Sequence, residues 1–134
     1  MWLNIKEEFK THLGQIFEDI CTEALVEMAK KNLLPLQIEK IGKWWRKETE
    51  IDIVGIESKG KKALAIEVKF TDLNYQEAKK LLSEIAIKAG QIRGAEECIL
   101  GVMAKRINDK EKLQNQGFIT FDFEDIENLR EREV

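Results

Sequence analysis

The spacing of hydrophobic residues changes along this chain, and that change constrains the fold more than any other feature. Residues 2–32 repeat apolar side chains at three- and four-residue steps, which predicts one long helical region, either continuous or broken near Gly14. From Leu36 the period shifts towards two, which is the spacing of a strand with one buried face. The chain is therefore expected to begin with a helix and to continue into a sheet.

The segments after residue 36 predict further strands and helices in a definite order. Strands are expected over 36–41, 50–56, 62–70, 97–104 and 118–121, and helices over 75–89, 109–115 and 123–130. Three sequential strands favour an antiparallel meander, and the later alternation of strand and helix favours parallel pairing. The expected fold class is α/β, a mixed sheet flanked by helices, in a single domain spanning residues 1–134.

The charge balance excludes some nucleic-acid-binding proteins but not all of them. A net charge of −3 excludes a wholly basic coat protein and leaves room for a basic patch. Between Lys30 and Lys47 six basic residues stand against one acid, whereas residues 109–134 carry eight acids and four bases. A phosphate-binding face would therefore come from the first of these segments, unless the charges only solvate the surface.

Features of membrane and secreted proteins are missing from the sequence. No apolar run approaches the ~20 residues that a membrane span needs, and the N-terminus lacks the regions of a signal peptide. Cys21 and Cys98 are far apart and suit two small buried thiols better than a metal site or a disulfide. We therefore expect a cytoplasmic protein with no membrane contact.

Two acidic residues are expected to face each other across the hairpin of the second and third strands. If the turn pairs Ser58 with Lys61, Asp52 lies opposite Glu67, and Glu50 lies opposite Lys69. Opposed side chains have Cβ atoms about 4.5–5.5 Å apart, and like charges at that distance repel. A divalent cation, a lysine or a shared proton would each relieve the repulsion.

A divalent metal suits this acidic pair. Mg²⁺ prefers oxygen ligands and commonly uses one or two carboxylates together with waters and a substrate phosphate. Lys69 beside the pair could orient or deprotonate a metal-bound water and stabilise charge on the phosphate. The alternative is that Glu67 and Lys69 are solvated residues, and that Glu50 and Lys69 form a weak cross-strand ion pair.

The acids and the lysine form a pattern that resembles the bipartite signature of the PD-(D/E)XK nuclease superfamily. The matching segments are Glu50-Ile51-Asp52 and Glu67-Val68-Lys69. Together with Gly14-x-x-Phe17-Glu18 and Trp44-Trp45-Arg46, they are similar to the nuclease-like domain at the C-terminus of a family of archaeal ATPases. Archaeal Holliday-junction resolvases share the general fold.

The resemblance implies specific roles for the matching residues. Asp52 and Glu67 correspond to metal-binding acids for Mg²⁺ or Mn²⁺, Lys69 to the catalytic lysine, and Glu18 to an acid from the first helix. Glu50 would be an accessory acid. The sequence departs from the pattern in having Ile51 where a proline commonly stands. A glutamine often found on the following helix has only loose counterparts, Gln76 and Gln91. Glu18 also suits a solvated helix face.

Candidates for contacting DNA lie in the basic segment. Arg46, Lys47 and Lys43 could bind the phosphate backbone, which gives affinity without sequence specificity. Trp44 and Trp45 are consecutive, so in a strand one faces the core and the other faces outward. The outward tryptophan either stacks on a base or covers the sheet, and Trp45 is the DNA-binding candidate.

Two classes of function follow from these observations. The first is metal-dependent hydrolysis of a DNA phosphodiester bond, by a nuclease that acts alone or as a homodimer. The second is a non-catalytic module that binds DNA or regulates a partner ATPase. No Gly-rich phosphate loop is present, so the chain itself is not expected to hydrolyse ATP.

Overall fold

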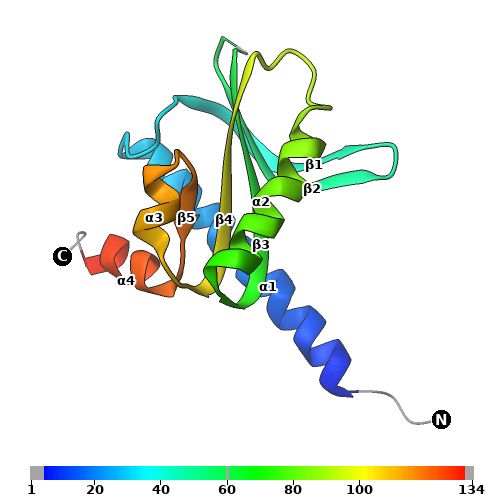
Figure 1. Ribbon diagram of the computed structural model, residues 1–134, viewed down its shortest axis with the longest axis vertical. Helices are drawn as coiled ribbons and strands as arrows, with labels where there is room; N and C mark the ends of the chain where they lie inside the picture. Colours follow the sequence, from blue (N-terminus) through cyan, green and yellow to red (C-terminus); the bar gives the residue numbers. More distant parts are fainter. Residues whose placement is uncertain (1–4, 60, 132–134) are drawn as a thin grey trace.

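The computed structural model describes residues 5–59 and 61–131, and its elements follow the order expected from the sequence (Figure 1). The helices are α1 (Ile5–Lys30), α2 (Tyr75–Ala89), α3 (Lys110–Asn115) and α4 (Phe123–Glu131). The strands are β1 (Ile38–Arg46), β2 (Thr49–Glu57), β3 (Lys62–Leu73), β4 (Glu97–Ile107) and β5 (Ile119–Phe121). Among the described residues, no helix is both long and apolar enough to cross a bilayer.

The strands form one five-stranded sheet in the order β1-β2-β3-β4-β5. The β1–β2 and β2–β3 pairs are antiparallel, whereas β3–β4 and β4–β5 are parallel. The parallel pairs need the α2 and α3 crossovers, because a hairpin can join only antiparallel neighbours. The predicted fold class, a mixed α/β sheet flanked by helices, is confirmed.

Two helical layers bury the two faces of the sheet. On one face, Phe17 of α1 and Ile126 of α4 pack with Leu64 and Ile66 of β3. The opposite face is covered by α2 and α3, which pack on β2, β3 and β4. In β3 the alternation expected from the sequence is confirmed, because the α2 face carries the small residues of the strand, Ala63 and Ala65.

A β-bulge interrupts β2. Gly42 pairs with Val54 and Trp44 pairs with Ile51, so three steps along β2 oppose two along β1. The extra residue reverses the alternation, and Ile51 packs with Val54 in the core beneath α2. Ile51 and Ile53 are two residues apart and would share a face in a regular strand, yet Ile53 packs beneath α1.

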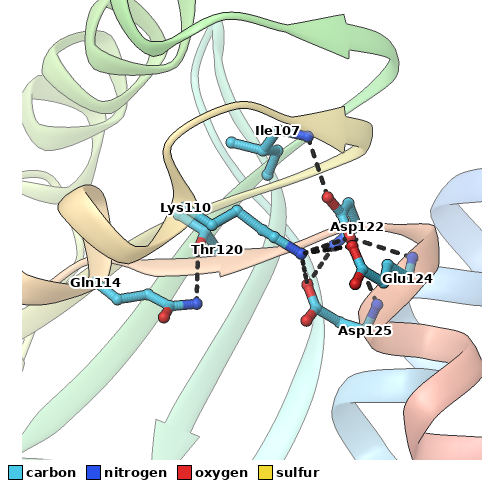
Figure 2. Close-up of polar contacts among 7 residues, drawn as sticks. All are labelled: Ile107, Lys110, Gln114, Thr120, Asp122, Glu124 and Asp125. Atoms are coloured by element: carbon cyan, nitrogen blue, oxygen red, sulfur yellow. Dashed lines mark hydrogen bonds and ion pairs between the residues drawn. The ribbon is translucent and has the colours of Figure 1, made fainter.

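The last helix is fixed to the sheet by one buried carboxylate, that of Asp122 (Figure 2). It accepts hydrogen bonds from the backbone N–H of Ile107 at 3.1 Å and from that of Glu124 at 3.1 Å. Lys110 Nζ lies 3.0 Å from the same carboxylate and 3.1 Å from Asp125. These bonds satisfy the buried acid and join the end of β4 to the start of α4.

Candidate functional site

The ladder between β2 and β3 ends beside Asp52 and Glu67. Its pairs run from Ile56–Ala63 to Ile53–Ile66, which is the register that the turn predicted. Two residues beyond Ile66, the backbone N–H of Val68 donates instead to a side chain, Asp52 Oδ2, at 2.9 Å. A side chain of β2 thus replaces its backbone as the acceptor, at the bulge where β2 separates from β3.

Asp52 and Glu67 lie close enough for their carboxyl groups to share a hydrogen bond. Burial is the main cause that raises the pKa of Glu67 to about 7, and the charge of Asp52 raises it further. Lys88 and Lys69 act in the opposite direction. The repulsion expected between the two acids is therefore present, and a proton or a lysine relieves part of it.

A lysine of α2 makes an ion-pair contact with this pair. Lys88 Nζ lies 3.8 Å from Glu67 Oε2, whereas Lys69 is exposed on β3. Lys88 is not among the site residues predicted from the sequence. A signal for it existed, because Lys88 is three residues from the buried Ile85 and therefore borders the face of α2 that covers the sheet.

Glu18 and Glu50 are joined by a second lysine on the α1 face of the sheet. Lys43 Nζ lies 3.3 Å from Glu18 and 2.8 Å from Glu50. The β2–β3 ladder ends before Glu50, so the expected pair with Lys69 does not form, and the bulge directs Glu50 towards Lys43 instead. Burial raises the pKa of Glu18, Lys43 lowers it, and the charge of Asp52 raises it again. Glu18 is thus electrostatically linked to the acidic pair.

The acidic pair has the donor chemistry of a magnesium site with two protein ligands. Both groups are carboxylates, and the rest of the coordination shell would be water or a substrate phosphate. Within residues 5–59 and 61–131, no three or more His, Cys, Asp or Glu side chains are grouped for metal binding. Glu18, expected as a third ligand, is held by Lys43.

The predicted DNA-binding residues lie together on the β1–β2 hairpin, which projects beside α2 (Figure 1). Trp45 is 64% exposed, whereas Trp44 packs against the core beneath α2. Lys47 lies in the hairpin turn with a left-handed backbone, φ 56°. Arg46 donates to the backbone oxygen of Gln91 at 3.2 Å. Of these candidates Lys43 already has acidic partners.

The two glutamines named from the sequence lie at opposite ends of α2. Gln91, just beyond the helix, donates through Nε2 to Thr49 Oγ1 at 3.1 Å and so ties the hairpin to α2. Gln76 is exposed in the first turn. Gln91 therefore positions the hairpin.

Two of the solved structures with partial similarity to this chain are as follows. A repair endonuclease from Pyrococcus abyssi aligns with a TM-score of 0.43 and 13% identity, covering 76% of this chain and 45% of that chain. The EndoMS-dsDNA2 complex aligns with a TM-score of 0.37 and 18% identity, covering 72% and 42%.

Sequence relatives place the chain in a family. The uncharacterized protein MJECL04 of Methanocaldococcus jannaschii is 36% identical over 124 residues, which is 91% of this chain. The chain spans only 27% of that relative's length. Residues 1–81 match DUF234, described as archaea bacterial proteins of unknown function. This match covers more than half of the chain, which therefore belongs to the DUF234 family.

Proposed function

We propose that this domain hydrolyses DNA phosphodiester bonds with the help of a divalent cation, Mg²⁺ or Mn²⁺, bound by Asp52 and Glu67. The observation that carries the proposal is the pair of carboxyl groups brought together at the end of the β2–β3 ladder. The resemblance of the two β-strand motifs to the PD-(D/E)XK signature, and the confirmed order of elements around them, support the same function.

A cation bound at this pair would polarise a phosphate oxygen and lower the pKa of a bound water. Asp52 is oriented for this task by the Val68 N–H, and Glu67 by the ammonium of Lys88. Lys69 is exposed on the same face of β3 as Glu67, and its ammonium would orient the attacking water. Glu18, through Lys43, would position the α1 side of the site.

The reaction is the addition of one water across a phosphodiester bond. The water oxygen forms a bond to phosphorus while the bond from phosphorus to one sugar oxygen breaks. The water loses a proton to solvent, and the leaving oxygen takes one up. Arg46 and Lys47 on the hairpin would contact backbone phosphates and hold the strand without reading its sequence.

A second function is favoured by the length of the relative. Because this chain spans 27% of MJECL04, a larger protein can hold a similar domain beside other parts. In such a protein the domain would bind DNA, or regulate an attached or partner ATPase, without cleaving. A homodimer, by contrast, would bring two sites to two strands and fits the nuclease function.

A cleavage assay separates these functions. Linear, branched and single-stranded DNA are incubated with the purified chain in Mg²⁺, in Mn²⁺ and in chelator. We expect metal-dependent cleavage that falls by about 100-fold or more in Asp52→Asn and Lys69→Ala, since each removes several kcal/mol of transition-state stabilisation. Glu48→Gln, in the exposed hairpin turn, is the matched acid control and should cleave normally. Binding without cleavage in every metal would favour the regulatory module.

A further inference from the structure

Trp45 is a large aromatic side chain exposed on the β1–β2 hairpin. It is 64% exposed, whereas the neighbouring Trp44 is partly buried and packs against the core. Lys43 Nζ lies 5.9 Å from the centre of its ring. The same ammonium contacts Glu18 and Glu50, so Trp45 lies near these two acids.

Two hydrogen bonds fix the position of the hairpin that carries Trp45. Arg46 bonds to the backbone of Gln91, and the side chain of Gln91 bonds to Thr49 in the returning strand. Both bonds link the hairpin to the segment that follows α2. The backbone that carries the ring is therefore held in place before any ligand binds, which reduces the entropy lost on binding.

The surroundings of Trp45 suit a nucleic-acid strand. A groove of about 350 Å³ runs along the hairpin and is lined by both tryptophans together with Arg46, Ile92 and Arg93. Lys47 adds a cation at the hairpin turn. Aromatic rings interleaved with cations bind bases by stacking and phosphates by charge.

We propose that Trp45 stacks on an unpaired base, so that the substrate class is DNA with a single-stranded segment, such as a flap, a fork or a frayed end. The inference deepens the proposed nuclease function and rests on it. In an intact duplex the faces of the bases are covered by their neighbours, so an exposed ring can stack on a base only where the strand is unpaired.

The test measures binding in chelator, where no metal-dependent cleavage occurs. The chain is titrated with single-stranded oligothymidine, with a flapped duplex and with a blunt duplex, and binding is followed by anisotropy of a dye on the DNA. We expect tighter binding to the first two ligands. In Trp45→Ala this preference should weaken by about fivefold or more, as loss of one stacked base predicts. Trp45→Phe should retain part of it.

Ile87→Ala is the matched control, because Ile87 is a large apolar residue that is 77% exposed on α2. It should bind all three DNAs as the unmodified chain does. Equal affinity for blunt and flapped DNA, unchanged by Trp45→Ala, would overturn the inference even if cleavage is observed. A change in oligomeric state without a change in DNA binding would also overturn it, and would assign Trp45 to a protein contact.

The proposed nuclease function fails in a different way. In one outcome, the preference for unpaired DNA depends on Trp45 but no cleavage occurs in Mg²⁺ or Mn²⁺. Trp45 then stacks on an unpaired base as proposed, and the domain is a binding module and not a nuclease. In the other outcome, cleavage depends on Asp52 but the three DNAs bind equally. The proposed nuclease function is then supported, and the proposed stacking of Trp45 on an unpaired base is wrong.

Discussion

Asp52 and Glu67 show how two residues of like charge can be held together in a folded chain. Asp52 is fixed by the Val68 N–H at 2.9 Å, so it cannot turn away from Glu67 without losing that bond. Glu67 is mostly covered, with 14% of its side chain exposed. The two carboxyl groups therefore repel each other in the folded chain when both are charged, and a bound cation would remove this repulsion.

This repulsion makes the stability of the metal-free chain depend on pH. Burial, then the charge of Asp52, raise the pKa of Glu67 to about 7 from an ordinary value of 4.5. Between these values the folded state keeps a proton that the unfolded chain has released. The free energy of unfolding therefore falls as the pH rises through this window.

Glu67→Gln should remove this pH dependence, because the amide carries no ionisable proton. At about pH 8 the variant should be more stable than the unmodified chain by roughly 1–3 kcal/mol. Urea unfolding in chelator at about pH 5 and about pH 8 measures the difference. An unchanged pH dependence in the variant would show that another group is responsible.

The two lysines near Glu67 should differ in their effect on it. Lys88 Nζ lies 3.8 Å from the carboxylate and lowers its pKa more than Lys69 does. Lys88→Met should therefore raise the pKa of Glu67 more than Lys69→Met, as measured by NMR titration of ¹³C-labelled carboxyl groups. A larger rise in Lys69→Met would contradict the geometry.

At the scale of elements, β3 could be predicted from the sequence and β2 only in part. From Lys62 to Lys69, before the register with β4 shifts, the alternation in β3 is regular, so the residues alone separate the α1 face from the α2 face. The bulge in β2 is a feature of its pairing with β1, and the Val68 N–H of β3 donates to Asp52 beside it. Both arise only after distant segments meet, and no local residue pattern encodes them.

In the candidate site, too, some contacts could be predicted from the sequence and others depend on how distant elements pack. The Ser58–Lys61 turn was sufficient to predict the β2–β3 register and hence the meeting of Asp52 and Glu67. Lys88 and Lys43 come from α2 and β1, and their partners depend on how those elements pack across the sheet. Periodicity assigns a residue to a face but does not choose its partner on another element.

The junction between β4 and α4 should be sensitive to one substitution. Asp122→Ala removes the acceptor for the Ile107 N–H and leaves Lys110 with less charge compensation in a partly buried place. We expect a loss of about 2–3 kcal/mol in the free energy of unfolding. Glu124→Ala, at a side chain that is 77% exposed, should change it by less than about 0.5 kcal/mol. Similar losses in both variants would contradict the role given to Asp122.

At the scale of the whole molecule, the charges are distributed unevenly. The overall charge is −3, yet the hairpin carries Arg46 and Lys47, and Arg93 lines the adjacent groove. Residues 109–134, with eight acids and four bases, supply much of the negative charge.

Because the cations lie on the proposed DNA-binding hairpin and groove, DNA binding should weaken steeply as salt rises. Arg93→Ala should reduce the slope of log affinity against log salt concentration by about one unit in a titration series. A slope equal to that of the unmodified chain would exclude Arg93 from the phosphate contacts.

Calorimetric titration with Mn²⁺ at about pH 8 tests whether Asp52 and Glu67 bind a divalent cation. We expect one binding site per chain, a melting temperature that rises with Mn²⁺ concentration, and loss of both effects in Asp52→Asn. Glu48→Gln should bind as the unmodified chain does. Mn²⁺ binding that is equally strong in Asp52→Asn, or absent from the unmodified chain, would show that these two carboxylates do not form the metal site.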